Sequence, residues 1–595
     1  MASPQSKTPR TQTPALTYTG ATALLEALNE AGVTYLFANF GSDHPAIVEA
    51  LAQARAAGDA VPQVITCPNE FVAMSAANGY AQVTGQAQAV LVHVECGTQS
   101  LGGAVHNAAK GRVPVLVIAG ASPFTQEGEL KGSRNEFIHW LQDVPDQRGI
   151  VRGYMKYDNE IRTARNMKQM IHRALQIAHS DPPGPVYLMA AREVLAEEVP
   201  PVKIDPAQWA RLSPQAMTPE GARMLAHDLA KARRPLAVTS YAGRNPKAVE
   251  QLVRLCERVG MGVYESSAGY LNFPADHPLY QGSQGNEPVQ NRALAEADVV
   301  LVLDSDVPWI PLLNQPSKSA KIYHIDVDPL KERTPLWYIP AAHVFRADVA
   351  TALAQVAAAL DTITVDHSLD GAAANERRSH YARLHGEWQA ERNRREQPRA
   401  DGTISAEYLT ARVREHIGGD AIVLNESITN YTAVNDHIGI TRAGMKMTSN
   451  ASSLGWNGGA AIGAKLALPD RFVAVLTGDG SYMFSQPSTV HWIARQYKTP
   501  FLTVIYNNRG WRAPKFSMLA QYSDGYASQA ANEGGEIGVT FDPPPDYAGI
   551  AAAAGGALAL TVKSADALDA ALAQAVRTVK EGQRSAVVDV WLPRL

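Results

Sequence analysis

The sequence contains little cysteine: Cys67, Cys96 and Cys256 are the three cysteines in a chain of 595 residues. They are too few and too scattered for a disulfide framework or a structural zinc site. The sequence also lacks an uninterrupted apolar run of about 18 residues, so no membrane-spanning helix is indicated. The net charge is only −4, which gives no reason to expect nucleic acid or an anionic membrane as a partner. These absences predict a cytoplasmic protein.

The composition is that of a soluble globular protein, with 46% apolar and 19% charged residues. Apolar β-branched runs alternate with helical patterns along most of the chain, which predicts parallel sheets. The expected fold class is α/β, with three open, mostly parallel sheet domains flanked by helices. We expect a disordered tail rather than a transit peptide at the N-terminus. The predicted segments are a tail at 1–18, a first domain at 19–196, a middle domain at 205–365, a charged linker at 366–402 and a third domain at 403–595.

Two apolar strands of the third domain each end in polar residues. Gly478-Asp479-Gly480 follows the run FVAVLT, and Asn507-Asn508 follows FLTVIY. The segment between them is long enough to be a helical crossover, so Asp479 and Asn508 should meet at the carboxyl edge of a parallel sheet. Their oxygens suit Mg²⁺ or Ca²⁺, and Gly480 with the following helix N-terminus suits a phosphate. The alternative is a tight turn and an unrelated asparagine loop, but the paired strands favour a site.

Three further segments precede this motif along the chain, in the order PNEFVAMSAANGYAQVTG, HIDVDP and SLGWNGGAAIGAKLALPD. The layout, over roughly residues 19–595, resembles the thiamine-diphosphate enzymes of the acetolactate synthase, pyruvate decarboxylase and benzoylformate decarboxylase superfamily. The resemblance implies thiamine diphosphate and Mg²⁺ as cofactors. It also implies that the first domain holds the cofactor's pyrimidine and the third its diphosphate. The sites would form between subunits of a homodimer or homotetramer.

The resemblance also implies roles for single residues. Asp479 and Asn508 match the metal ligands that act through side chains, and Gly510 matches the one that acts through its backbone carbonyl. Glu70 matches the glutamate that bonds the pyrimidine N1′ and shares a proton with it. The alternative for Glu70 is an acidic residue that interacts with a helix N-terminus. The other implied cofactor contacts are Ser427, Ser452 through its carbonyl, Leu454 beneath the bent cofactor, Gly478, Gly480 and Ser481.

Three local matches favour the benzoylformate decarboxylase branch. Ser42 stands where that branch has a serine contacting the substrate carboxylate, and His93 stands where it has a catalytic histidine. The third match is the stretch Asn425-Glu426-Ser427. We therefore expect Ser42 and His93 to handle the carboxylate and proton transfer. The alternatives are a helix cap for Ser42 and a core histidine for His93. His44 is a rival for the acid–base role, as is His106, whose pattern is more typical of a helix surface or interface.

Other segments differ from these relatives. Segment 122–155 matches neither branch and is expected to line the entrance. The run from Asp306 to Pro311 stands where acetolactate synthases have a flavin-associated arginine segment, so FAD is doubtful. Tyr482, Phe484 and Trp511 are candidates for an apolar pocket wall, and equally for core or interface residues.

The resemblance implies decarboxylation of a 2-oxo acid with an apolar or aromatic tail. The cofactor's C2 ylide would add to the keto carbon, CO₂ would leave, and the enamine would be protonated to an aldehyde or captured by an aldehyde or ketone acceptor. An acetolactate-synthase-like carboligase, a 2-hydroxyacyl-CoA lyase and a non-catalytic cofactor-binding regulator are the alternatives. Intact Glu70, Asp479 and Asn508 speak against the regulator. The chain ends at Leu595 directly after its last strand, which speaks against the lyase.

Overall fold

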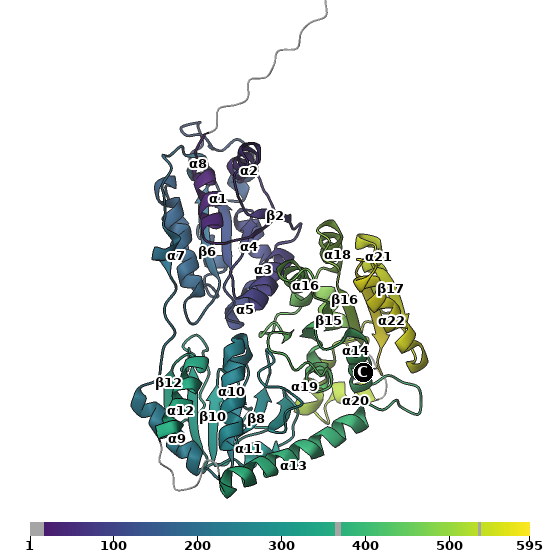
Figure 1. Cartoon of the computed structure of the whole chain (residues 1–595). Coiled ribbons are helices and arrows are strands. Elements are labelled where there is room, and N and C mark those ends of the chain that lie inside the picture. Colours follow the sequence, from purple (N-terminus) through teal and green to yellow (C-terminus); the bar gives the residue numbers. More distant parts are fainter. Residues whose placement is uncertain (1–16, 363–370, 533–536, 595) are drawn as a thin grey trace, which may run out of the picture.

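The described part of the chain forms three six-stranded sheets with helices on their faces (Figure 1). A computed structural model describes residues 17–362, 371–532 and 537–594. The tail expected at the N-terminus lies, up to residue 16, outside the described residues. All strand pairs within the three sheets are parallel, which confirms the predicted fold class. Within the described ranges, no helix combines the length and apolar character needed to cross a bilayer.

The first sheet has the strand order β2-β1-β3-β4-β6-β5. Its strands are β1 Tyr35–Ala38, β2 Gln63–Thr66, β3 Ala89–Val92, β4 Leu116–Ala121, β5 Tyr157–Ile161 and β6 Val186–Ala191. Its helices are α1 Gly20–Glu30, α2 Pro45–Ala57, α3 Glu70–Thr84, α4 Val94–Ser100, α5 Gly102–Lys110, α6 Ile138–Leu141, α7 Met167–His179 and α8 Arg192–Ala196.

The middle sheet has the order β12-β11-β10-β7-β8-β9, which is the order of dinucleotide-binding sheets. Its strands are β7 Pro235–Thr239, β8 Gly262–Ser266, β9 Tyr280–Gln284, β10 Val299–Leu303, β11 Lys321–Asp326 and β12 His343–Arg346. Its helices are α9 Pro219–Lys231, α10 Pro246–Val259, α11 Arg292–Glu296 and α12 Val349–Thr362, and the long α13 Ala372–Arg395 follows them.

The third sheet has the order β14-β13-β15-β16-β18-β17. Counted from its own first strand, this order is the same as in the first sheet. Its strands are β13 Ile422–Glu426, β14 Lys446–Met447, β15 Val473–Gly478, β16 Leu502–Asn507, β17 Leu558–Val562 and β18 Ala586–Trp591. Its helices are α14 Ala406–Ile417, α15 Tyr431–His437, α16 Trp456–Ala467, α17 Asp479–Phe484, α18 Pro487–Gln496, α19 Arg512–Gln521, α20 Tyr526–Asn532, α21 Tyr547–Gly555 and α22 Ala565–Lys580.

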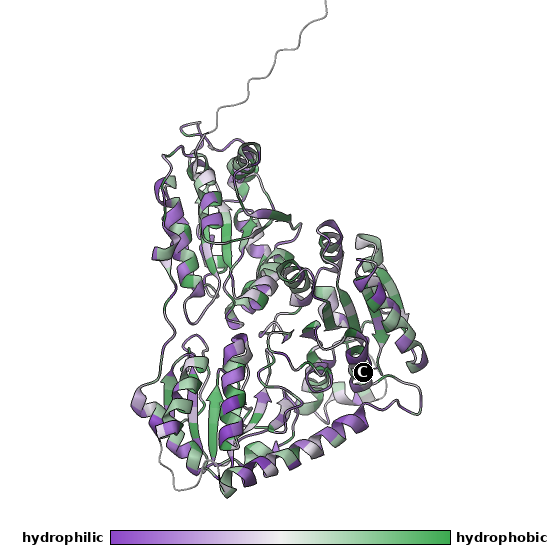
Figure 2. Ribbon diagram, in the orientation of Figure 1, coloured by the Kyte–Doolittle hydropathy of each residue, from purple (hydrophilic) through white to green (hydrophobic). Residues whose placement is uncertain are grey.

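Helices α3 and α16 join the first and third units. Both are rich in small residues, and they approach so closely that a Cβ on Gly79 would lie 2.4 Å from the carbonyl oxygen of Ala460. A Cβ on Gly463 would lie 1.9 Å from that of Ala76. Glycine at these positions therefore permits backbone-to-backbone packing. One apolar core runs through both units, and Figure 2 shows apolar strands inside and polar helix faces outside.

The charged segment predicted as a linker forms α13 over Ala372–Arg395; residues 366–370 of it lie outside the described ranges. Tyr381 of this helix is buried and donates its hydroxyl to the carbonyl of Pro235 at 2.8 Å. Figure 1 shows the helix running along the middle unit toward the third. One face of the charged helix is thus part of the middle unit's packing.

Candidate active site

The carboxyl edge of the third sheet brings Asp479 and Asn508 together. Asp479 begins α17 directly after β15, and Asn508 follows the neighbouring strand β16. The buried Asp479 carboxylate accepts the backbone N–H of Gly480 at 2.8 Å and that of Gly510 at 3.1 Å. Burial raises the pKa of Asp479 to about 6, against the lowering effect of these N–H groups. A positive charge nearby would therefore stabilise the ionised form of this buried carboxylate.

The two neighbouring asparagines have different surroundings. Asn507 donates its Nδ2 to Asp589 Oδ1 at 2.8 Å, and its Oδ1 accepts the N–H of Arg509 at 3.0 Å. Asn508 is 4% exposed, and its Oδ1 has no hydrogen-bond partner in the described structure. A buried carbonyl oxygen without a donor, beside a carboxylate, fits a hard divalent cation.

The oxygens that the sequence predicted as metal donors are one carboxylate, one amide and the backbone carbonyl of Gly510, which accepts the N–H of Arg512 at 3.1 Å. No three His, Cys, Asp or Glu side chains of the described residues gather as a metal-binding group.

A small cradle lies beside this edge. A Cβ on Gly478 would lie 3.9 Å from the carbonyl oxygen of Ser427 and 4.0 Å from Ser481 Oγ, so these three residues share one space. Ser427 Oγ donates to Asn425 Oδ1 at 2.7 Å. At Gly480 a Cβ would lie 2.3 Å from the Trp511 ring, so a side chain there would displace the indole. The space suits a group that accepts hydrogen bonds from hydroxyls and from backbone N–H groups at the start of α17.

Glu426 fixes the loop before α16, a function that the sequence did not reveal. Its buried carboxylate accepts N–H groups from Gly455 at 2.6 Å and Asn457 at 2.8 Å. Burial raises the pKa of Glu426 to about 7, against these hydrogen bonds. The loop it holds carries Leu454, which is partly exposed, and the exposed Ser452. Glu426 thus sets where both predicted cofactor contacts lie.

Glu70 lies at the carboxyl edge of the first sheet. It is the first residue of α3, whose N-cap is Asn69, and it is 8% exposed. Its Oε1 accepts Asn39 Nδ2 at 2.8 Å, and a Cβ on Gly97 would lie 3.2 Å from the same oxygen. The carboxylate is therefore held by one amide in a space that Gly97 leaves open.

His93 and Ser42 lie at the same edge as Glu70. The strand predicted to include His93 ends at Val92, so His93 is the N-cap of α4 instead of a strand residue. Its Nδ1 bonds Asp43 Oδ1 at 2.5 Å and not the backbone carbonyl of the core-histidine alternative. Ser42 is not the N-cap of α2, a position that His44 takes, and its buried Oγ has no hydrogen-bond partner among the described residues.

The two rival histidines lie elsewhere. His44 is completely buried, and its Nδ1 accepts the N–H of Gly41 at 3.0 Å, so it lies behind Asp43. His106 Nε2 lies 3.1 Å from Ser452 Oγ, between the first and third units. The signal missed in the sequence was Asp43 itself, an acid adjacent to two expected site residues.

Segment 122–155 covers this edge. Gln142, just after α6, lies 3.7 Å from Cys96 Sγ through its Nε2 and is a polar neighbour that raises the pKa of His93. The segment exposes a set of large apolar side chains: Phe124, Leu130, Phe137, Trp140, Leu141, Val144, Ile150 and Tyr154. That this segment lines the entrance stays a prediction.

The pocket aromatics of the third unit separate into two groups. Tyr482 is buried with Tyr547, onto whose carbonyl its hydroxyl donates at 3.2 Å, so it is a core residue. Phe484 is half-exposed and packs edge-on against Trp511 at 5.9 Å between ring centroids. Of the three aromatic residues, Trp511 lies against Gly480 beside the cradle, and Phe484 packs against Trp511.

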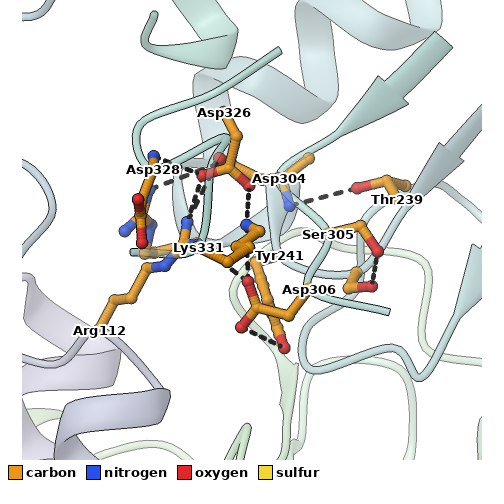
Figure 3. A network of polar contacts seen from close by, with 12 residues as sticks. Arg112, Thr239, Tyr241, Asp304, Ser305, Asp306, Asp326, Asp328 and Lys331 are labelled. Atoms are coloured by element: carbon orange, nitrogen blue, oxygen red, sulfur yellow. Dashed lines mark hydrogen bonds and ion pairs between the residues drawn. The ribbon is translucent and has the colours of Figure 1, made fainter. Parts of the chain in front are cut away.

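Protein side chains fill the crevice of the middle sheet (Figure 3). Arg112, from the loop after α5, reaches Asp326 Oδ1 at 2.8 Å and Asp306 Oδ1 at 3.0 Å. Lys331 Nζ lies 2.6 Å from Asp326 Oδ2 and 2.7 Å from Asp306 Oδ1. Asp304 and Asp306 follow β10, and Asp326 ends β11, so all three lie at the carboxyl edge of the sheet. Arg112 and Lys331 thus lie against three aspartates, of which Asp304 is the third.

Within the described residues, no hydrogen bond or ion pair joins Glu70 or His93 to Asp479 or Asn508. One chain therefore presents two polar sheet edges. The first carries carboxylates and histidine, and the third carries an oxygen donor set with a hydroxyl-lined cradle. This combination defines a cofactor-dependent enzyme of the α/β class.

Three family models match the chain and together cover most of it. They are the N-terminal TPP binding domain of thiamine pyrophosphate enzymes over residues 18–150, the central domain over 223–381 and the C-terminal TPP binding domain over 427–590. The chain belongs to the thiamine pyrophosphate enzymes, and it is a thiamine-diphosphate-dependent enzyme of the superfamily that its sequence resembles.

Individual relatives agree with this assignment. A probable 2-ketoarginine decarboxylase of Pseudomonas aeruginosa is 26% identical over 508 residues, covering 83% of each chain. The acetolactate synthase large subunit of Lactococcus lactis is 23% identical over 549 residues, covering 90% of this chain and 87% of that one. A thiamine-diphosphate-dependent 4-hydroxybenzoylformate decarboxylase of Rhodococcus jostii shares the fold with a TM-score of 0.75 at 22% identity, covering 97% and 99% of the two chains.

Proposed function

We propose that the protein is a Mg²⁺-dependent 2-oxo acid decarboxylase of the benzoylformate decarboxylase kind. The observation that carries this is His93, held 2.5 Å from the Asp43 carboxylate at the same sheet edge as Glu70. A decarboxylase must put a proton on carbon after CO₂ leaves, and a histidine with a raised pKa is suited to donate it.

The third sheet would hold the cofactor's charged end. Asp479 and Asn508 would bind Mg²⁺ through their side chains and Gly510 through its carbonyl, while Ser427 and Ser481 would contact the diphosphate. The buried, unpartnered Asn508 Oδ1 supports this arrangement. When bound, thiamine diphosphate supplies an electron sink at the carbon under attack. Leu454 and the carbonyl of Ser452 orient its rings.

The first sheet handles the substrate and protons. Ser42 Oγ, buried without a partner, binds the substrate carboxylate, and Glu70 exchanges a proton with the pyrimidine ring. The bond between the carboxylate and the 2-oxo carbon breaks, CO₂ leaves, and the electron pair stays on the former 2-oxo carbon. One proton from His93 then gives the aldehyde.

The working unit is at least a homodimer. In the described part of one chain, no hydrogen bond or ion pair joins the two polar edges, which supports completion of each site by a second chain. The exposed apolar side chains of segment 122–155, such as Phe137 and Leu141, would then be covered by that chain.

Carboligation is the second candidate function. The observation that favours it is the match to an acetolactate synthase along 90% of this chain. In that reaction a second carbonyl compound, and not a proton, would take the electron pair. The Asp43–His93 pair favours protonation, so aldehyde release is the main outcome proposed.

A panel of 2-oxo acids tests the proposal. Benzoylformate, its 4-hydroxy derivative, 2-ketoarginine, pyruvate and branched aliphatic acids are supplied with thiamine diphosphate and Mg²⁺, with and without an aldehyde acceptor. CO₂ and organic products are identified. The benzoylformate decarboxylase kind of activity proposed here predicts the fastest turnover for acids with apolar or aromatic tails. A panel that yields only 2-hydroxy ketones would assign carboligation, and no CO₂ from any acid would overturn the proposal.

A further inference from the structure

Asp43 lies directly behind His93 and has no exposed surface to speak of, at 1%. One carboxylate oxygen bonds His93 Nδ1, and the other accepts the backbone N–H of Val94 at 3.1 Å. His44 Nε2 lies 3.2 Å from the second oxygen. The carboxylate is thus buried between two imidazoles, and it is anchored by the first turn of α4.

Two glycines keep the space that this pair needs. A Cβ on Gly41 would lie 2.0 Å from His93 Nδ1, and a Cβ on Gly120 would lie 1.5 Å from Asp43 Oδ2. Neither glycine has a positive φ, so the backbone at these positions would accept other residues. Glycine is required at these two positions because any side chain would overlap the His93–Asp43 pair. The fold therefore reserves the volume for a carboxylate and an imidazole in contact.

The pKa values of the two histidines beside Asp43 are shifted in opposite directions. The hydrogen bond to Asp43 raises the pKa of His93, against burial, which lowers it. Burial lowers the pKa of His44, against the charge of Asp43. Burial alone would raise the pKa of Asp43, but the charge of His44 and the bond from His93 lower it overall. Of the two, His93 is the one whose protonated form the surroundings favour, and it is also the one with exposed surface, at 18%.

Other groups surround the pair. The titratable groups that interact electrostatically with His93 or Asp43 are His44 before α2, Glu70 of α3, His139 of α6 and Tyr187 of β6. Glu70 also raises the pKa of His93 through its charge. Only Asp43 is in direct contact with the His93 ring nitrogens through an ionised group.

We infer that Asp43 is a positioning residue for His93, which fixes the imidazole with Nδ1–H on the carboxylate so that Nε2 carries the proton that is transferred. This inference rests on the proposed function. The proton passes from Nε2 to the former 2-oxo carbon and leaves a neutral imidazole still held through Nδ1–H. Solvent then returns a proton to Nε2 for the next turnover. Asp43 stays ionised throughout, so charge and atoms balance.

The pair also has a consequence for stability. Because the pKa of His93 is raised in the folded protein, its contact with Asp43 contributes fully below the ordinary histidine pKa of about 6.5. The contribution is lost as pH rises through the raised value.

The test is a histidine NMR titration of the protein without cofactor, with His93 assigned from a His93→Gln variant. In the wild type, His93 is expected to titrate above about 6.5 and His44 below it. In Asp43→Asn the His93 pKa is expected to fall by at least about one unit, a tenfold change in its protonation equilibrium. Asp146→Asn, at an exposed pair with Arg152, is the matched control and should leave His93 unchanged.

Kinetics provide the second readout. In Asp43→Asn, kcat should fall about 100-fold and the basic limb of its pH profile should move to lower pH, while KM and cofactor affinity stay near wild type. Gly41→Ala, which pushes the ring from Asp43 without removing a polar group, should move the limb in the same direction.

A wild-type His93 that titrates at or below about 6.5 overturns the inference even if every variant fails to fold. An unmoved His93 pKa in a folded Asp43→Asn variant overturns it as well. Because the titration needs neither substrate nor turnover, a shifted pKa without any decarboxylation would sink the proposed function and leave the pair intact.

Discussion

The first and third sheets have the same strand order, yet they carry different chemistry at the same positions. His93 follows the third strand of the first sheet, and Asp479 follows the third strand of the other. Each stands at the start of a helix at the carboxyl edge. Topology therefore delivers a polar side chain to this place twice, and residue type decides whether it handles protons or a cation.

The two edges also differ in what their buried acids anchor. Asp43, in the loop after β1, accepts the N–H of Val94 at the start of α4, the helix that follows the third strand. Glu426, the last residue of β13, accepts the N–H groups of Gly455 and Asn457 at the start of α16, the helix that precedes the third strand. Asp43 thus fixes the turn that presents His93, whereas Glu426 fixes the loop of Leu454 and not the turn that presents Asp479.

The middle sheet shows a third use of the same kind of edge. Its strand order differs, and its crevice holds Arg112 from the first unit against three aspartates (Figure 3). Arg112, Asp304 and Lys331 all have positive φ, an unfavourable backbone state for such residues. The crevice therefore joins two units at a place where related topologies bind a ligand.

The largest effect is expected at the third edge. Asp479→Ala removes the only carboxylate of the proposed metal set, so Mg²⁺-dependent binding of thiamine diphosphate should weaken by more than about 100-fold and turnover should be lost. Calorimetric titration with cofactor, with and without Mg²⁺, measures this. Unchanged affinity would place the metal elsewhere.

At the first edge, Glu70→Gln should separate binding from chemistry. The amide keeps the size of the side chain and loses the exchangeable proton, so turnover should fall by about 10²–10⁴-fold with cofactor affinity near wild type. Steady-state kinetics and the same titration give the two numbers. Equal losses of both would make the two edges alike and break the comparison.

At the middle edge the effect should be on stability. Arg112→Met removes one of the two cations buried against Asp306 and Asp326 and leaves Lys331 as the other, which should cost up to about 3–5 kcal/mol in free energy of unfolding. Urea unfolding measures this. Arg152→Met, which breaks the exposed pair with Asp146, is the control and should change little. A stable Arg112→Met protein that gains nucleotide binding would show that the arginine closes the crevice without holding the units together.

The smallest effects should distinguish two adjacent asparagines. Asn508→Ala is expected to weaken metal and cofactor binding by about 10–100-fold with little loss of stability. Asn507→Ala leaves Asp589 without its amide donor and should cost about 1–3 kcal/mol of stability with affinity retained. The reverse pattern would exchange their roles.

The sequence predicted the three-sheet architecture because strands and helices alternate with strong apolar runs. The sequence also predicted that Asp479 and Asn508 follow neighbouring parallel strands, and β15 and β16 pair in this way. It did not predict that the strand before His93 would end at Val92, because the apolar pattern continues through Val94. Nor did it predict β5, whose residues YDNEI lack such a run.

The contacts of the buried acids could not be predicted from the sequence. Asp43 bonds a residue 50 positions away, and Arg112 bonds one 214 positions away. Nothing local marks such pairs, since each depends on how loops from different strands converge. The close approaches that require Gly41 and Gly120 are likewise visible only in three dimensions.

The central claim is that the two edges are halves of one site completed by a second chain, and mixing two inactive variants tests it most directly. Glu70→Gln chains retain an intact third edge, and Asp479→Ala chains retain an intact first edge. Dissociated, mixed in equal amounts and reassociated, they should recover about a quarter of wild-type turnover, because half of random dimers are mixed and each mixed dimer has one intact site. No recovery, with mixed dimers shown to be present, would contradict the account.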